Sequence, residues 1–543
     1  MAGRAASGAS PVSEPDGFEE MPGSPARQGL VERTWSHDSS GSRMVPFGLF
    51  EAPHSQPNTP LISNCTARAD MIAPLLFFQR PSDSSIVPQL STPTLASPKP
   101  FGIDWIKKLL AFTGPGWLMS VAYVDPGNLE ADLQCGAQFG YTLLWVLLGA
   151  TCVGLGMQLV AARLGCVTRQ HLAEHCRQHY AWHTRICLWL LTELAIIGSD
   201  IQEVIGGAIG FQLLFYLPLW QGVILTAAAA FGFLFLERFG TRPLELFFGV
   251  LIMVLAVSMG ALFALIKPDR SAVLEGLFVP RLPASAMSQA VGMLGCIIMP
   301  HNLFLHSALV QSRVIEPGEE EEAIQLYSIE STAAIFTSVV INTCVVAVFA
   351  KGFYGSPDAE RIGLENAGIF LGNRFGEPLR IIWALGLCAA GQSSTMTGAY
   401  AGQWVMQGYL ELKVKPWKRA IITRSMALIP TLLVAAYFEG GSVGLDTLNS
   451  YLNILQSLVL PFAVVPLLSF AGARCLMGDF VLSFGAKLCG WTAAGTVMLA
   501  NTYLFVEAVG GVLSFGLVFG IGVYVSAVAY VALTPTLDGA PSA

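Results

Sequence analysis

Long runs of apolar residues, separated by short polar segments, dominate the chain from about residue 107 onward. Most runs reach the roughly 20 residues that an α-helix needs to cross a bilayer. Barrel strands would instead be short segments of alternating hydrophobicity, so we predict an all-α polytopic membrane protein. The pattern predicts twelve spans, near 109–138, 141–163, 184–209, 218–236, 244–266, 287–311, 324–350, 380–409, 418–437, 447–471, 481–507 and 513–533.

The first span is interrupted by the polar tetrapeptide Asp125-Pro126-Gly127-Asn128. Pro126 cannot donate a backbone hydrogen bond and Gly127 is a poor helix former, so the helix should break at mid-membrane. A carboxylate there costs about 2.5–3.5 kcal/mol on the insertion scale, which points to a functional role. The break offers carboxylate, amide and carbonyl oxygens, which are hard ligands for a cation. The structural alternative is that Asp125 caps the second half-helix.

The sixth span carries a second interruption at Met299-Pro300. A thioether is a soft ligand that suits transition metals rather than Mg²⁺ or Ca²⁺, although a lone Met is more often a core residue. Two broken helices in corresponding places are typical of a transporter binding site. Because each break opens a unit of five spans, an odd number, the second unit must be inverted in the membrane. We therefore predict a 5+5 inverted repeat with two further helices outside it.

Composition supports a membrane protein and excludes several other classes. Only 12% of the 543 residues are charged, 53% are hydrophobic, and the mean hydropathy is +0.57. The net charge of −7 argues against a nucleic-acid partner, and the eleven scattered Cys residues give no support for a disulfide scaffold. The chain contains no G-x-x-x-x-G-K-[ST] motif, so we expect an ion gradient to drive transport, with no enzyme activity and no resident cofactor.

The polar segments divide the chain and predict its orientation. Residues 1–100 are rich in Ser, Pro, Gly and Ala and predict a disordered tail, followed by a transporter domain at 101–533 and a short C-terminus at 534–543. One set of alternate loops carries more Lys and Arg, which places the N-terminus in the cytosol, and an even number of spans places the C-terminus there too. The pattern distinguishes neither a plasma membrane from an endosomal or vacuolar one nor any oligomeric state.

Titratable residues follow two of the spans. Glu193, Asp200 and Glu203 in the third span are spaced by seven and three, so they share one helical stripe. Carboxylates on one face of a membrane helix mark an ion or proton path, unless they pair with Arg or His as fixed structure. His301 and His306 follow the second break, and imidazole suits proton handling as well as packing.

Four segments of the chain together resemble one known family. They read GPG followed by DPGN, TELAIIGSDIQEVIG, IIMPHNLFLHSALVQSR and LCAAGQSSTMTGAYAGQ. They resemble the Nramp family of proton-coupled divalent metal transporters, over about residues 101–533. The resemblance implies a LeuT-type fold with metal bound between broken helices 1 and 6. It also implies uptake of Mn²⁺ and Fe²⁺ toward the cytosol with protons.

The resemblance implies which residues bind the metal. The family's side-chain ligands match Asp125, Asn128 and Met299. Its backbone carbonyl ligands match Ala122 and Cys296. Cys296 departs from the family, which usually has Ala there. The carbonyl survives this change, and the thiol either packs against a neighbouring helix or adds affinity for softer ions such as Cd²⁺ or Cu⁺.

Further polar residues match positions around that site. Asn453 matches a tenth-helix residue that joins the site, with Gln456 as the competing alignment, and Gln158 matches a polar residue near the first ligand. Residues that match the family's proton path and gate are Asp200, Glu203, His301 and His306, and Arg313 and Arg424 lie at the cytosolic ends of spans six and nine. We expect the two arginines to pair with the third-span carboxylates along a proton exit, which places Arg313 on the proton path. The alternative is that both side chains snorkel to the headgroups.

Three other functions remain open on the sequence. A family relative tuned to Mg²⁺ or Al³⁺ is disfavoured by the retained Met299. An organic-solute symporter of the same fold would leave the half-helix N-termini free for a substrate carboxylate, which Asp125 disfavours. The third alternative is a sensor that binds metal without net transport.

Overall fold

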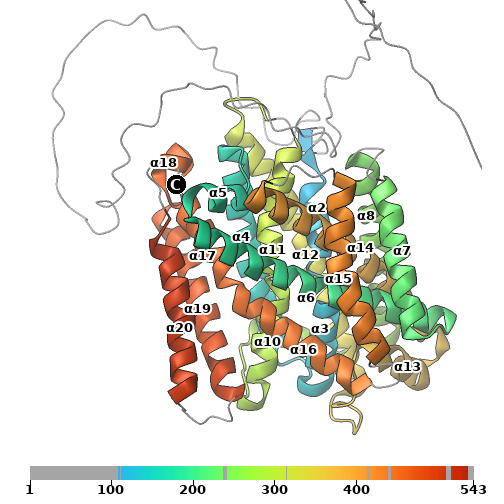
Figure 1. Cartoon of the computed structure of the whole chain (residues 1–543). Coiled ribbons are helices and arrows are strands. Elements are labelled where there is room, and N and C mark those ends of the chain that lie inside the picture. The colour runs from blue at the N-terminus through green and yellow to red at the C-terminus, as the bar shows by residue number, and fades with distance from the viewer. Residues whose placement is uncertain are drawn as a thin grey trace, which may run out of the picture. The chain divides into compact units, whose positions relative to one another are not determined.

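The computed structural model describes residues 112–236, 241–313, 315–411, 416–437, 442–508 and 515–535, together with 105, 108 and 109. Within these residues every regular element is a helix (Figure 1). The predicted tail at 1–100 and most of the predicted C-terminal segment at 534–543 lie outside the described residues.

A helix or a helix pair occupies each of the twelve predicted ranges. In chain order they are α2 (Pro115–Val121) with α3 (Pro126–Phe139), α4 (Leu144–Thr168), α6 (Trp182–Phe215), α7 (Leu219–Leu236), α8 (Thr241–Ile266), α10 (Met287–Ile297) with α11 (Pro300–Leu309), α12 (Glu320–Phe353), α14 (Glu377–Leu410), α15 (Pro416–Tyr437), α16 (Ser442–Val459) with α17 (Pro461–Ala471), α19 (Phe484–Ala508) and α20 (Phe515–Leu533). Shorter helices lie between them: α5 (Leu172–His179), α9 (Arg270–Phe278), α13 (Leu364–Phe375) and α18 (Arg474–Met477).

Six described helical segments are long and apolar enough, by length and composition, to cross a membrane. They are Leu144–Thr168, Trp182–Phe215, Leu246–Ile266, Ala284–Ser312, Glu320–Phe353 and Gly444–Ala471. The predicted sixth and tenth spans are each one such segment, although each contains a proline that divides it into two helices.

Glycines allow the two central helices, α6 and α14, to pack backbone to backbone. A Cβ added at Gly391 of α14 would lie 2.5 Å from the Cα atom of Gly207 on α6. One at Gly210 would lie 2.8 Å from the backbone nitrogen of Cys388. Small residues that permit such approaches are characteristic of membrane helix interfaces. The rows of Gly and Ser in the eighth span therefore serve close packing.

The first span lies between two clusters of buried apolar side chains. Its second half, α3, contributes Ala131 and Cys135 to a cluster that includes α4, α11 and α17. The same helix contributes Leu129 and Leu133 to a second cluster that includes α6, α8 and α14. The break between α2 and α3 is thus enclosed by helices on both sides, which keeps its polar groups away from the lipid.

Candidate metal site at two helix breaks

The first break is organised by one proline. Pro126 has no N–H, so the carbonyl of Ala122, four residues earlier, lacks its helical donor. Asn128 Nδ2 donates to this carbonyl at 3.2 Å and to Asp125 Oδ1 at 2.8 Å. The backbone N–H of Asn128 also donates to Asp125 Oδ1, at 2.8 Å, so Asp125 does cap α3.

Capping of α3 leaves two oxygen atoms of the first break unpaired. Asp125 and Asn128 are 0% and 1% exposed, yet Asp125 Oδ2 and Asn128 Oδ1 have no hydrogen-bond partner among the described residues. Buried polar atoms are nearly always paired, so two orphaned oxygens at one helix break indicate a missing partner. A cation would satisfy both oxygens, and the capping role of Asp125 and a ligand role use different oxygens of the same carboxylate.

The second break repeats the arrangement of the first. Pro300 begins α11 and removes the helical donor of the carbonyl four residues earlier, which is that of Cys296. Met299 is the N-cap residue of α11 and is 1% exposed. The Cys296 thiol donates to the Met293 carbonyl at 3.4 Å, along its own helix, which favours the packing interpretation of this thiol.

Among the described residues, no group of three or more His, Cys, Asp or Glu side chains is arranged to hold a metal ion. The available donors are instead mixed: one carboxylate, one amide, one thioether and two backbone carbonyls. Such a set binds less tightly than a cage of carboxylates or thiolates, since most of its ligands are neutral. It fits an ion that must leave again, which is what transport requires.

Polar residues of α12 hold the first break from one side. Ser338 Oγ donates to the Ser120 carbonyl at 2.9 Å, and Asn342 Nδ2 donates to the Tyr123 carbonyl at 2.7 Å. Two turns earlier on the same helix face, Glu330 Oε1 accepts the backbone N–H groups at the start of α2. Sequence reasoning missed these residues, although polar positions 330, 338 and 342 on one face of an apolar span were an available signal.

The carboxylates of α6 approach the second break through a serine. Ser199 Oγ donates to Glu203 Oε1 at 2.8 Å and lies 3.9 Å from Met299 Sδ. A Cβ added at Gly398 of α14 would lie 2.3 Å from Asp200 Oδ1 and 3.0 Å from Glu203 Oε2. The predicted carboxylate stripe is therefore next to the Met299 thioether at its Glu203 end. Glu193, also buried, lies nearly two turns before Asp200 on the same helix.

Both tenth-helix candidates bind one glutamine that sequence reasoning did not single out. Gln202 of α6 donates to Asn453 Oδ1 at 2.8 Å, and its Oε1 accepts from Gln456 Nε2 at 2.8 Å. Gln202 in turn lies against the first break, because a Cβ added at Gly127 would be 3.1 Å from its Oε1. A Cβ added at Gly295 of α10 would be 2.4 Å from the Asn453 carbonyl. Asn453 thus lies beside both broken helices, with its side-chain oxygen bound by Gln202.

The two histidines of α11 are fully enclosed. His301 and His306 are 1% and 0% exposed. Within the part of the chain that the structure describes, His301 Nδ1 and both ring nitrogens of His306 have no hydrogen-bond partner. Beyond them Arg313 donates to the Thr113 carbonyl at 3.2 Å, which joins the chain after α11 to the chain before α2. The side chain of Arg424 lies outside the described residues.

Gln158 of α4 is a further buried amide near the first break. It is 1% exposed, and neither its side-chain oxygen nor its nitrogen finds a hydrogen-bond partner in the described ranges. Gly154, one turn earlier on the same face, packs against Tyr123, whose Oη would lie 2.6 Å from a Cβ added there. This places the orphaned amide on the face of α4 that covers the break between α2 and α3.

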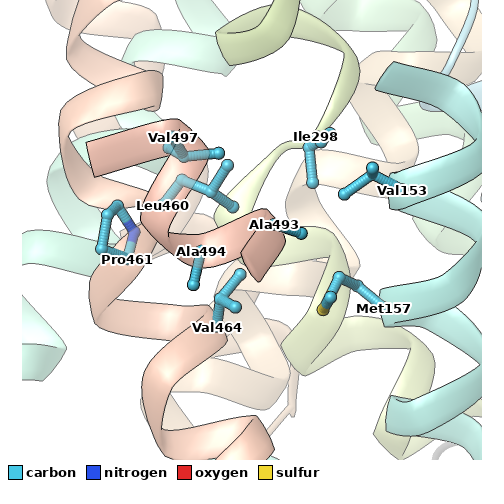
Figure 2. Close-up of a pocket in the computed structure, with 9 residues that line it drawn as sticks. All are labelled: Val153, Met157, Ile298, Leu460, Pro461, Val464, Ala493, Ala494 and Val497. Carbon is cyan, nitrogen blue, oxygen red and sulfur yellow. The ribbon is translucent and has the colours of Figure 1, made fainter. Parts of the chain in front are cut away.

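A wholly apolar pocket lies behind the second break, between α4, α17 and α19 (Figure 2). Its lining residues are Val153, Met157, Ile298, Leu460, Pro461, Val464, Ala493, Ala494 and Val497. Ile298 directly precedes Met299, so the pocket lies next to the second break.

These features define a class of protein. An all-helical, multi-pass membrane protein with two proline-broken helices, each opening one of two inverted five-helix units, has the LeuT-type fold. The structure of Mhp1, a nucleobase-cation-symport-1 family transporter, shares the fold with a TM-score of 0.50 at 16% identity, over 79% of this chain and 95% of that one.

The family follows from a closer set of similarities. The sequence model described as natural resistance-associated macrophage protein-like, Nramp, matches residues 116–507, and the chain belongs to this family. It is 50% identical over 448 residues to metal transporter Nramp2 of Arabidopsis thaliana, covering 80% of this chain and 83% of that protein. A metal transporter Nramp2 of Populus trichocarpa is 51% identical over 438 residues, with 78% and 82% covered.

Among solved structures, a manganese transporter of Eremococcus coleocola superposes with a TM-score of 0.69 at 29% identity, over 80% of this chain and 94% of that one. The protein is therefore a metal transporter of the Nramp family, a class whose members are not enzymes.

Proposed function

We propose that this protein is a secondary active transporter that moves Mn²⁺ and Fe²⁺ toward the cytosol together with protons, by alternating access. The observation that carries the proposal is the pair of proline breaks. They leave Asp125 Oδ2 and Asn128 Oδ1 without partners and deprive the carbonyls of Ala122 and Cys296 of their helical donors. In the proposal these four oxygens and the Met299 thioether surround the ion. Asn453 joins them when the helices move.

The metal selectivity rests on Met299. Mg²⁺ and Ca²⁺ are hard ions that keep oxygen ligands and pay heavily to lose water, whereas Mn²⁺ and Fe²⁺ accept a thioether more readily. Met299 is buried at the break and has Ser199 Oγ 3.9 Å from its sulfur. A thioether at this position therefore favours transition metals over Mg²⁺.

The proposed proton coupling rests on two features, the competition of metal and proton for Asp125 and the contacts that lead from Met299 to the carboxylates of α6. The carboxylate of Asp125 must be deprotonated to bind a cation well, so metal and proton compete for it. From Met299 the contacts run through Ser199 to Glu203 and, beside Gly398, to Asp200. We assign the proton pathway to Asp200, Glu203, His301, His306 and Arg313, with the two histidines acting in both proton coupling and gating.

The membrane potential supplies the direction. An inward-negative potential of 100 mV favours entry of each positive charge by about 2.3 kcal/mol, or about 4.6 kcal/mol for a divalent ion. In this proposal both termini are cytosolic, the metal is cargo, and no resident cofactor takes part.

The test is Mn²⁺ uptake by the full-length protein in proteoliposomes with an imposed inward proton gradient. Wild type is compared with Asp125→Ala and Met299→Ala, with and without excess Mg²⁺. Met293→Ala is the matched control, since Met293 is an equally buried methionine of the same span. We expect Asp125→Ala to abolish uptake and Met299→Ala, but not Met293→Ala, to let Mg²⁺ compete.

Other outcomes would favour the alternative functions. If Mg²⁺ blocks wild-type uptake as strongly as it blocks Met299→Ala, the thioether does not select the metal and a Mg²⁺ or Al³⁺ transporter is the better interpretation. If purified wild type binds Mn²⁺ but vesicles accumulate none, the protein is a sensor. If it neither binds nor moves a divalent ion, an organic solute becomes the candidate substrate.

A further inference from the structure

A third proline break lies outside the metal site, between α16 and α17. Pro461 has no N–H, so the carbonyl of Ser457, four residues earlier, lacks its helical donor. Asn501 of α19 supplies that donor from Nδ2 at 2.7 Å. In return the Ser457 hydroxyl donates to Asn501 Oδ1 at 2.6 Å, so the two residues form a reciprocal pair. Both are 0% exposed.

The second hydrogen of the same amide engages the last helix. Asn501 Nδ2 lies 3.0 Å from Tyr524 Oη of α20, and this hydroxyl donates to the Leu458 carbonyl at 3.1 Å. Every donor and acceptor of the Asn501 amide therefore has a partner. A buried polar network that is fully satisfied holds its members in one arrangement, because any shift leaves a polar group unpaired in an apolar surrounding.

The bonded face of α16 is also the face that touches α10. A Cβ added at Gly295 would lie 2.7 Å from Ser457 Cβ and 2.4 Å from the Asn453 carbonyl. Gly295 directly precedes Cys296, whose carbonyl the proposed function assigns to the metal. The place where Ser457 of α16 packs against α10 therefore sets the position of the Cys296 carbonyl.

The other contacts of the tenth-span break with α19 are apolar and non-directional. Leu460 and Pro461 line the pocket behind the second break together with Ala494 and Val497 (Figure 2). Apolar contacts of this kind tolerate sliding, whereas the amide does not. At this helix–helix contact the directional restraint on α16 comes from Asn501.

We propose that Asn501 is a positioning residue for metal binding. It locks the break of the tenth span against α10 and thereby keeps the Cys296 carbonyl and Asn453 directed at the ion. The last two helices, which lie outside the inverted repeat, thus take part in shaping the site. This inference rests on the proposed function, because it assumes that the Cys296 carbonyl meets the metal.

The experiment compares Asn501→Leu, Ser457→Ala and Tyr524→Phe with Thr502→Val, all in the full-length protein. Thr502 is the matched control, since it neighbours Asn501 on α19 and its hydroxyl bonds only the Met498 carbonyl of its own helix. Three quantities are measured: the Mn²⁺ Kd of purified protein by calorimetry, the KM of Mn²⁺ uptake, and the melting temperature. The first two report on positioning, and the third reports on folding.

We expect Asn501→Leu, which removes all three hydrogen bonds of the side-chain amide, to raise both Kd and KM about tenfold. Ser457→Ala removes one of these bonds, and Tyr524→Phe removes the bond from Asn501 and the bond to the Leu458 carbonyl. Both variants should raise Kd and KM by about threefold, and Thr502→Val should stay within about twofold of wild type. The inference is overturned if Asn501→Leu lowers the melting temperature but binds and transports Mn²⁺ with wild-type constants.

A double variant tests whether Asn501 positions the metal site or only supplies a donor to the Ser457 carbonyl. Pro461→Ala restores an N–H for the Ser457 carbonyl, so in the Asn501→Leu background it should recover the melting temperature but not the Kd. Recovery of both would mean that Asn501 acts only by satisfying the carbonyl, which also overturns the inference. Wild-type protein that neither binds nor transports Mn²⁺ would overturn the proposed function itself, an outcome distinct from both.

Discussion

The tether between Asn342 and the first break gives a prediction that can be worked from the structure. Asn342 Nδ2 donates to the Tyr123 carbonyl at 2.7 Å, two residues before Asp125. Asn342→Leu keeps nearly the same volume but leaves this carbonyl buried without a donor. Such a group costs about 1–3 kcal/mol, and the whole cost falls on the state in which the break is packed against α12.

Part of that cost should appear in metal affinity. If the break rearranges to satisfy the carbonyl, Asp125 moves with it, and a cost of about 1–3 kcal/mol corresponds to a loss of about fivefold to 150-fold in Mn²⁺ affinity. The assay is calorimetric titration of purified protein with Mn²⁺, together with the melting temperature. Thr337→Val is the control, because Thr337 is a half-buried residue of the same helix whose hydroxyl bonds the Ala333 carbonyl of that helix.

The reasoning fails if Asn342→Leu has both the wild-type affinity and the wild-type melting temperature. That result would mean that the Tyr123 carbonyl finds another donor at no cost. The view that α12 holds the first break would then be wrong. A lower melting temperature with unchanged affinity would restrict the role of Asn342 to folding.

Three further predictions test other parts of the structure. Gly398→Ala should abolish proton-driven uptake, measured as Mn²⁺ accumulation against pH, because its Cβ would lie 2.3 Å from Asp200 Oδ1. Gly136→Ala should cost about 1–3 kcal/mol of stability, since its Cβ would lie 2.3 Å from the Val346 carbonyl, whereas Gly149→Ala, with nothing within 4 Å, should be neutral or stabilising by up to about 1 kcal/mol. In α5, which lies between two spans, burial lowers the pKa of His175 to about 3, so stability is complete above pH 6.5 and falls by about 2 kcal/mol by pH 5.

Each of these has a decisive control. Gly398→Ala with wild-type uptake at every pH would show that the two carboxylates need no space at α14. Equal melting temperatures for Gly136→Ala and Gly149→Ala would show that the contact between α3 and α12 yields freely. His175→Gln cannot be protonated at this position, so its melting temperature should fall less than that of wild type between pH 7 and pH 5. An identical fall in both would refute the assignment to His175.

The positions of the helix breaks were predictable from sequence because their cause is local. A proline removes its own N–H whatever surrounds it, so Pro126 and Pro300 each deprive a carbonyl four residues earlier of its donor. The breaks, the presence of a carboxylate and a thioether beside them, and the stripe of carboxylates in the third span all follow from spacing along the chain. The helices lie close to the predicted ranges for the same reason, since apolar length is a local property.

Which side chains pair with the freed carbonyls and with the polar residues around the breaks was decided by the tertiary structure alone. Asn342 lies 219 residues from the carbonyl that it meets, and Gln202 lies 251 residues from Asn453. No spacing rule relates such positions, because their contact depends on how whole helices cross. The sequence left Asn453 and Gln456 as competing candidates, whereas the fold joins both to Gln202. Local covalent chemistry therefore determined where the helices break and leave backbone carbonyls without their helical donors. Long-range packing determined which side chains donate to those carbonyls.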